Sequence, residues 1–295
     1  MSSIHSIQRV RAATNAIPIF VAATFLVLAA APARAQFPGD VPDTFRLDVG
    51  GMYAWFTTNV NFQENLTPGG PIGGGIDLQP VTGLPSSTGG FTARGYWQPL
   101  KRFYIDFGYT EFTRSSTRAI SVDIPFGDST FTAGASVATS VKSELPYIDL
   151  RYNFIQNDSW HLGVSLGGAY SILKAGLTAS AGVIGPNGPI VGQSTTREAK
   201  LEVPVPLLGI DAEFKFGDRV SGGVLFNGIF APVHPYSGSV FVVEPHVDWF
   251  ISKNFGVGGA FNYSTFHIKK DDLPATLIDF RYSYYGPKVY AILTF

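Results

Sequence analysis

Short segments that alternate strictly between apolar and polar side chains recur along this chain, and they constrain its fold more than any other feature. In FYIDFGYT, which begins at Phe103, apolar side chains alternate with mostly polar ones. Similar segments begin at Phe45, Ile148, Ile210 and Ile278. Successive side chains of a β-strand point to opposite faces, so this period of two predicts strands with one apolar and one polar face.

Ten segments follow this pattern, although the glycine-rich stretch 255–263 follows it less strictly. We therefore predict ten antiparallel strands, and eight or twelve remain open because strand boundaries are hard to place from sequence. The expected strands are 44–57, 91–98, 103–114, 138–155, 160–178, 199–216, 219–230, 239–251, 255–268 and 277–295.

Alternation by itself also fits a soluble β-sandwich, so the choice of architecture depends on further features. The polar faces carry full charges, and the opposite faces are almost purely aliphatic or aromatic, which in water would require a second covering layer. Short connections at 99–102, 156–159, 217–218 and 252–254 alternate with longer ones. The longer connections are 58–90, 114–137, 181–197, 231–238 and 269–276. Alternating short and long connections between strands are typical of barrels in the bacterial outer membrane. We therefore predict an all-β, transmembrane, antiparallel up-and-down β-barrel.

Tryptophan placement agrees with this prediction. Three of the 4 Trp residues, Trp97, Trp160 and Trp249, flank the expected short turns. Aromatic residues gather where a membrane meets water, so these three mark one interface. No segment after position 35 has the roughly 18 consecutive apolar residues of a membrane helix, so a membrane location must come from strands.

The first 35 residues differ in composition from the rest of the chain. Arg9 and Arg11 precede an apolar run at 17–31, which ends in the small-x-small site Ala33-Arg34-Ala35. This is the pattern of a cleavable secretory signal peptide, so we expect 1–35 to be removed and 36–295 to form the barrel domain. An uncleaved anchor is the alternative, but the apolar run is short for a membrane span.

Composition excludes several classes of function. With 0 Cys the chain has no disulfide, thiolate metal site or cysteine nucleophile. Its 21 basic and 22 acidic residues become 18 and 22 once Arg9, Arg11 and Arg34 are removed, a net charge of -4. That balance gives no electrostatic footprint for nucleic acid, so we expect none as a partner. We predict no cofactor.

The C-terminal segment carries two signals. Gly286-Pro287 interrupts the last strand, and the apolar positions change from even to odd numbers there, so we predict a β-bulge and a change of face. The chain ends in AILTF, with Leu293 and Phe295 at alternating positions.

This ending resembles the C-terminal signal of bacterial outer-membrane β-barrel proteins, which the barrel assembly machinery recognises. Those proteins commonly favour Tyr where this chain has Leu293. The whole chain is also similar to uncharacterised outer-membrane barrels of its length. The resemblance implies a bacterial outer-membrane location, contact with outer-membrane lipid, and recognition of Leu293 and Phe295 by the assembly machinery. An even number of strands with short periplasmic turns places both termini in the periplasm.

The charged residues of the polar faces are expected to line the lumen. They are Arg46, Asp48, Arg94, Asp106, Asp149, Arg151, Asp211, Glu213, Lys215, Glu244, Asp248, Asp279 and Arg281. Small barrels are filled by their own side chains, so these residues form either a network of compensating charges in a structural barrel or the lining of a narrow passive pore. Acids outnumber bases among them, so any pore would favour cations. A surface interaction protein that acts through its outer loops, with an unknown external partner, is the alternative function.

Two catalytic patterns in the strands are interpreted as structural. Gly163-Val164-Ser165-Leu166-Gly167 matches the nucleophile motif Gly-x-Ser-x-Gly, but that motif requires a strand-to-helix turn and this copy lies inside an alternating strand. His246 and Asp248 share one face of a strand near the short turns and are expected to form a structural pair.

The outer rim gives the better enzyme hypothesis. Omptin proteases resemble this chain in strand number, and His234, His267, Asp271 and Asp272 could approach one another at the rim. However, no Asp-x-His pair stands on an outer strand end, and no constellation for lipid A modification can be assigned. We therefore predict that the protein is not an enzyme and has no catalytic or metal site.

The first long connection, 59–90, is the most unusual segment outside the expected strands. Its glycines at 73–75 and prolines at 68 and 71 argue against regular structure. A connection this long is usually functional or disordered. It could constrict the barrel mouth, bind a partner or stay mobile.

Overall fold

The protein is described from a computed structural model of all 295 residues, and its architecture is almost entirely β-sheet. The described residues are 44–64, 72–76, 82–126, 129–179, 181–185, 188–190, 194–233, 236–272 and 276–295. The predicted signal peptide at 1–35 lies outside them. No helix in the described part of the chain is long and apolar enough to cross a membrane.

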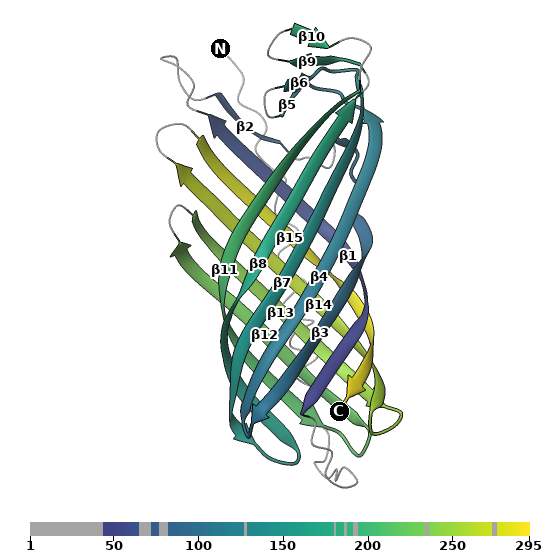
Figure 1. Ribbon diagram of the computed structural model, residues 1–295, viewed down its shortest axis with the longest axis vertical. Helices are drawn as coiled ribbons and strands as arrows, with labels where there is room; N and C mark the ends of the chain where they lie inside the picture. The colour runs from purple at the N-terminus through teal and green to yellow at the C-terminus, as the bar shows by residue number, and fades with distance from the viewer. Residues whose placement is uncertain are drawn as a thin grey trace, which may run out of the picture.

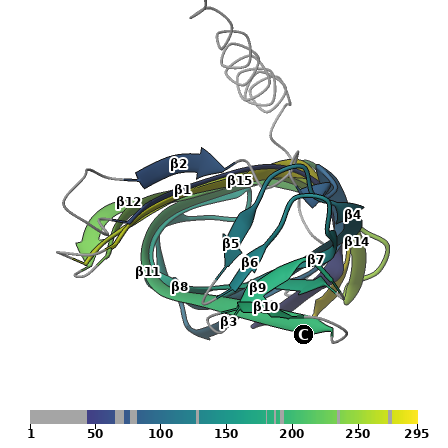
Figure 2. The same ribbon diagram turned by 90° about the horizontal axis from the view of Figure 1, so that it is seen from above.

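Ten long strands form the wall of a closed barrel, which confirms the predicted fold class (Figures 1 and 2). Each strand pairs antiparallel with its sequence neighbours in the wall, and β15 pairs with β1 to close the sheet. The wall strands are β1 (Phe45–Glu64), β3 (Ser87–Leu100), β4 (Phe103–Ala119), β7 (Ser136–Gln156), β8 (Trp160–Ala179), β11 (Thr195–Lys215), β12 (Val220–Val233), β13 (Tyr236–Phe250), β14 (Phe255–Asp272) and β15 (Thr276–Thr294).

Short turns join the wall strands at one end of the barrel, which we call the short-turn end. Arg102, between β3 and β4, has a φ of 72°, and Gly217, between β11 and β12, has a φ of 91°. Between β7 and β8, the Asn157 side-chain oxygen accepts hydrogen bonds from the backbone N–H groups of Ser159 and Trp160 at 2.9 and 3.0 Å. Such Asx turns close a chain reversal within a few residues. β1 begins and β15 ends at this end of the barrel, where the Phe45 N–H donates to the Phe295 carbonyl.

The last strand runs through Gly286-Pro287 without changing face, so the predicted β-bulge is wrong. The register of β15 against β1 is the same on both sides of this dipeptide, although residues 286 and 287 themselves have no paired partner in β1. Gly286 is buried because β1 passes very close, and a Cβ atom added there would lie 1.9 Å from the Tyr53 carbonyl oxygen. Glycine therefore marks a close approach of two strands here, and the side-chain alternation continues.

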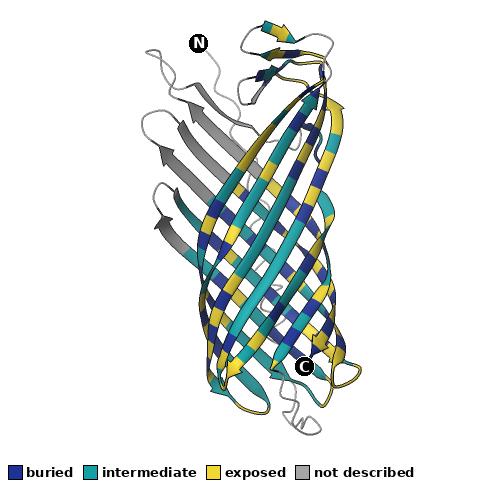
Figure 3. Ribbon diagram, in the orientation of Figure 1, coloured by how far each residue is buried: buried dark blue, intermediate teal, exposed yellow. Residues whose placement is uncertain are grey.

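Exposed and buried residues alternate along the wall strands (Figure 3), and the exposed ones are apolar over much of the wall. On β7 the exposed residues Ile148, Leu150, Tyr152 and Phe154 alternate with buried ones. Trp97 and Trp249 are exposed near the short turns, and Trp55 stacks on Tyr285 higher on the wall. An apolar band between two aromatic girdles is the outer surface expected of a barrel in lipid.

Charged residues follow directly above this band on the outward face of β4, β7, β8 and β11. Lys142 of β7 pairs in register with Lys174 of β8, which pairs in turn with Lys200 of β11. We call the set Glu111, Lys142, Glu144, Lys174, Lys200 and Glu202 the outer charged belt. Its ion pairs include Lys174–Glu144 at 2.7 Å and Lys200–Glu202 at 2.6 Å, which offset the repulsion between the aligned lysines.

At the long-loop end, opposite the short turns, four short strands form a separate sheet that we call the rim sheet (Figure 1). The strands are β5 (Ile124–Phe126), β6 (Ser129–Phe131), β9 (Val183–Gly185) and β10 (Gly188–Ile190), in the order β10-β9-β6-β5. An apolar cluster joins this sheet to the upper ends of β7 and β8, with Phe131 and Val137 fully buried. Pro125 and Pro189 stand in the middle of the two edge strands, where a missing N–H limits further strand pairing.

Part of the connection 59–90 is regular structure, contrary to the prediction. β1 continues to Glu64, and β2 (Ile72–Ile76), which contains the three glycines, pairs antiparallel with its upper part. Backbone hydrogen bonding to β1 offsets the low strand propensity of glycine. This pairing places 72–76 on the wall. The predicted roles for the remainder at 65–71 and 77–81 concern residues outside the described set.

Candidate functional site

The wall strands direct most of the charged residues predicted for the lumen into the barrel interior. Asp48, Asp149, Arg151 and Asp248 are almost fully buried although they are charged. The others that face inward are Arg46, Arg94, Asp106, Asp211, Glu213, Lys215 and Glu244. They lie in the half of the barrel nearer the short turns. We call this region the charged layer.

Two predicted lumen residues stand apart. Arg281 is exposed on the outward face of β15, because the expected change of face at Gly286-Pro287 does not occur, so its assignment to the lumen is wrong. Instead Tyr282 and Tyr284, expected to face outward, are buried inside. Asp279 belongs to β15, but its side chain lies outside the described residues.

One half of the charged layer connects β1, β3, β13 and β15. Arg46 donates to Asp48 at 2.8 Å and to Asp248 at 2.6 Å. Arg94 donates to Asp48 at 2.9 Å and to Glu244 at 2.8 Å. Buried ions are tolerated only when they are paired and hydrogen-bonded, and here each arginine bridges two carboxylates. The network therefore fastens opposite parts of the wall together.

The other half centres on Arg151 of β7. Its guanidinium donates two bonds to Asp106, at 2.9 and 3.0 Å, and a third to Asp211. The rings of Tyr96 and Tyr104 lie 5.5 and 4.4 Å from it. Arg151 does not pair with Asp149, which lies two residues away on the same face of β7. Its partners lie on the neighbouring wall strand β4 and, across β8, on β11.

The sequence reasoning omitted three residues of this layer. Lys288 donates to Glu244 at 3.0 Å, Tyr290 donates to Asp248 at 2.7 Å, and His161 lies 2.6 Å from Asp211. Lys288 and Tyr290 alternate with the exposed Val289 and Ala291. This alternation could have placed the Lys288 and Tyr290 side chains inside the barrel.

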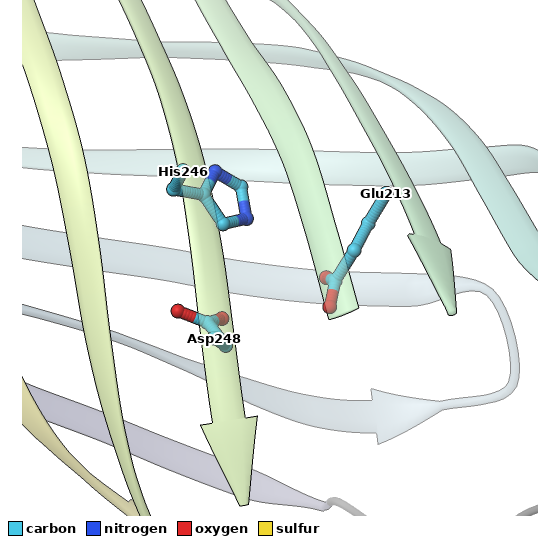
Figure 4. Close-up of side chains that lie close together, drawn as sticks. All are labelled: Glu213, His246 and Asp248. Atoms are coloured by element: carbon cyan, nitrogen blue, oxygen red, sulfur yellow. The ribbon is translucent and has the colours of Figure 1, made fainter. Parts of the chain in front are cut away.

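Glu213, His246 and Asp248 come together in this layer as a potential metal-binding group (Figure 4). Each offers a ligand atom, and these atoms lie within 4.8 Å of one another. However, the two Asp248 oxygens already accept hydrogen bonds from Arg46 and Tyr290. The Arg46 guanidinium therefore provides the positive charge that a metal ion would supply, and it would repel a cation placed beside it. We assign the three residues to the ion-pair network.

An apolar layer lies across the lumen between the charged layer and the long-loop end. The Phe56 ring packs on Phe112 at 5.1 Å and on Tyr284 at 5.9 Å, and Phe266 stacks on Tyr284 at 6.2 Å. Arg114 lies over the Phe56 ring at 4.4 Å. We call the following contacting set the aromatic layer: Met52, Ala54, Phe56, Phe112, Ala169, Val203, Val205, Leu207, Val240, Phe266, Tyr282 and Tyr284. These residues come from seven wall strands and pack together inside the barrel.

The remaining candidates of the sequence lie in strands or outside the described residues. Ser165 of the Gly-x-Ser-x-Gly pattern is buried inside β8. His267 lies on β14, whereas His234 is not described, and the side chains of Asp271 and Asp272 are not described either. No rim constellation can therefore be built from the described residues. Leu293 and Phe295 are exposed on the outward face of the wall.

Comparison with known proteins supports the fold. The sequence matches no protein-family model and no curated protein. The solved structure of the outer-membrane protease OmpT from Escherichia coli is similar with a TM-score of 0.52 at 11% identity, covering 88% of this chain and 99% of that one. This chain has the fold of a bacterial outer-membrane β-barrel. At this identity the likeness concerns the fold alone.

Two further solved structures match at lower similarity. The translocator domain of the autotransporter NalP from Neisseria meningitidis has a TM-score of 0.40 at 12% identity, covering 95% of this chain and 96% of that one. The outer-membrane protein OprG from Pseudomonas aeruginosa has a TM-score of 0.33 at 8% identity, covering 83% of this chain and 95% of that one. Their low TM-scores carry no argument about this chain.

Proposed function

We propose that this protein is a non-conducting barrel of the bacterial outer membrane, with both termini in the periplasm and the rim sheet outside the cell. The observation that carries the proposal is the aromatic layer, which fills the lumen with contacting rings. A water-filled path for ions would have to cross this layer, and ions enter apolar regions only at high cost. The charged layer below it then serves to hold the wall together.

The narrow, cation-favouring pore remains the competing hypothesis. The charged layer encloses a cavity of only about 70 Å³, which leaves room for a few water molecules. Among the described residues of the charged layer, seven acidic side chains face inward (Asp48, Asp106, Asp149, Asp211, Glu213, Glu244 and Asp248), against five basic ones (Arg46, Arg94, Arg151, Lys215 and Lys288). This excess would attract cations if the aromatic layer opened.

Single-channel recording in a planar bilayer tests the proposal. The refolded mature protein should show no conductance steps, whereas the double variant Phe56→Gly/Phe112→Gly should conduct, because it removes two contacting rings. Phe91→Gly, which changes an exposed ring on the outward face, is the matched control and should stay silent. Discrete steps from the wild-type protein would refute the closed lumen.

The rim sheet favours a second candidate function, interaction with an external partner. Val122 and Ile184 expose 46% and 45% of their surface beside a sheet that has an apolar core of its own. The two edge prolines restrict pairing at the strand edges, so we propose that a partner docks on the exposed apolar side chains. We also propose that the protein is not an enzyme, since Ser165 is buried in a strand and Asp248 is bonded to Arg46.

Display of the protein on bacterial cells tests the rim interaction. Cells with the wild-type protein should adhere to plates coated with serum proteins, or to one another, more than cells with Val122→Ser/Ile184→Ser. The double variant Lys101→Ser/Leu100→Ser, at the opposite end of the barrel, is the control. Equal adhesion of all three would refute this candidate without affecting the conductance result.

A further inference from the structure

A cavity opens at the short-turn end, below the charged layer, and we call it the vestibule. Its volume is about 570 Å³, within the roughly 300–1,000 Å³ typical of small-molecule sites. The aromatic layer lies farther along the lumen, so the vestibule is closed at its inner end. It is therefore shaped to hold a solute.

The charged side chains that line the vestibule are mostly basic. They are Arg46, Arg151, Lys215, Arg219 and Lys253 against Glu213 and Asp218. The carboxylates that pair with Arg46 and Arg151, such as Asp48 and Asp106, lie deeper and do not line this cavity. Arg219 and Lys253 are exposed on two different short turns at its mouth. A concave surface lined mainly by positive charge attracts anions.

A polar atom that lacks a partner lies on the same lining. The Gln156 side-chain oxygen is buried without a hydrogen-bond partner, although the nitrogen of that amide donates to Tyr104 at 3.1 Å. The buried Ser221 hydroxyl also lines the cavity, beside the Glu213 carboxylate. Buried polar atoms normally have partners, so the Gln156 oxygen indicates bound water or a hydroxyl group of a solute.

We propose that the vestibule binds a small anionic solute that also carries hydroxyl groups, of the sugar-phosphate class. The basic side chains at the mouth, Lys215, Arg219 and Lys253, bind the phosphate, and the Gln156 and Ser221 side chains bind hydroxyl groups deeper in the cavity. This site goes beyond the proposed function, because it concerns the end of the barrel opposite the rim sheet. It does not require the lumen to conduct.

Isothermal titration calorimetry of the refolded mature protein in detergent tests the site. Glucose 6-phosphate should bind saturably, and the affinity should fall as salt is added, because surface charges are screened. Glucose and inorganic phosphate should each bind at least about tenfold more weakly, because each lacks one of the two groups that are recognised.

The triple variant Lys215→Gln/Arg219→Gln/Lys253→Gln should weaken binding at least about tenfold, since charge-assisted hydrogen bonds are the strong ones. Lys101→Gln is the matched control, because Lys101 is an exposed basic residue on a short turn at the same end but does not line the vestibule. Its affinity should equal that of the wild type. Absence of saturable binding, equal binding of glucose or phosphate alone, or equal weakening by Lys101→Gln would each overturn the proposal.

Discussion

The Nη2 atom of Arg46 lies 2.6 Å from the Oδ2 atom of Asp248, although 202 positions separate the two residues. Arg46 stands on the first wall strand and Asp248 on β13, and the two wall strands β14 and β15 lie between them in the sheet. Both side chains are nearly fully buried. The pair therefore ties together parts of the wall that no direct strand pairing joins, and it exists only in the closed barrel.

Asp248→Ala should strongly destabilise the barrel, because it leaves the buried Arg46 guanidinium short of one of its two carboxylates. Breaking a buried ion pair typically costs about 3–5 kcal/mol. Urea unfolding of the protein in lipid vesicles, followed by tryptophan fluorescence, measures the free energy. Lys200→Ala removes the more exposed Lys200–Glu202 pair and should cost less than about 1 kcal/mol. Equal losses for both variants would contradict the assigned role of the charged layer.

Phe112→Ala should also destabilise the barrel, because the Phe112 ring contacts Phe56 and Tyr284 at 5.1 Å each and is almost fully buried. Truncation of a buried Phe costs about 3–5 kcal/mol. Phe91→Ala serves as the control, because its ring faces outward, where lipid replaces the lost contacts. The same urea titration measures the free energy of unfolding of both variants. If Phe91→Ala loses as much stability as Phe112→Ala, the aromatic layer is not specially stabilising.

Gly286→Ala should impair folding, because the added methyl group would meet the Tyr53 carbonyl oxygen where β1 and β15 close the barrel. Overpacking of this kind costs about 1–3 kcal/mol or more. Gly89→Ala is a control in neighbouring β3, where an added Cβ meets nothing within 4 Å. The refolding yield and urea stability should fall for the first variant only. Normal folding of Gly286→Ala would refute the close approach.

Acid should remove the stabilising effect of Glu144 in the outer charged belt. The Lys174 ammonium, which donates to the carboxylate at 2.7 Å, lowers the pKa of Glu144 from 4.5 to about 2. A carboxyl whose pKa is lowered on folding stabilises fully above its unfolded pKa, and this effect is lost as the pH falls through the folded value. Glu144→Gln should therefore destabilise by up to about 1 kcal/mol near neutral pH, and this effect should shrink towards pH 2 and vanish below it. If the difference in stability between the wild type and Glu144→Gln does not change with pH, the Lys174–Glu144 ion pair is not the source of that difference.

The strands could be predicted from sequence because each is a local pattern. In segments such as 148–154 the apolar side chains must face lipid and the polar ones must face inward, so a period of two reveals both the strand and its faces. Short turns such as that at Asn157 are likewise encoded by a few neighbouring residues. The ten strands, the short turns and the closed architecture followed from these signals.

The sequence failed where the character of a side chain did not identify its surroundings. Tyr282 and Tyr284 are as compatible with lipid as with a packed lumen, so their aromatic character gave no direction and led to the false change of face. The barrel has an apolar inner layer as well as an apolar outer surface. A strand segment that runs between the apolar inner layer and the apolar outer surface has two apolar faces. The alternation of apolar and polar side chains therefore disappears there.

By itself the sequence determined which segments form strands, where the short turns lie and which charged residues of the lower wall face inward. Only the tertiary structure decided which of those charges pair. Arg151 reaches Asp106 and Asp211 on other strands, whereas its sequence neighbour Asp149 is left aside. The aromatic layer and the vestibule were decided at the same level. The physical reason is that alternation is a property of one strand, whereas pairing and packing across the lumen depend on how ten strands register and close.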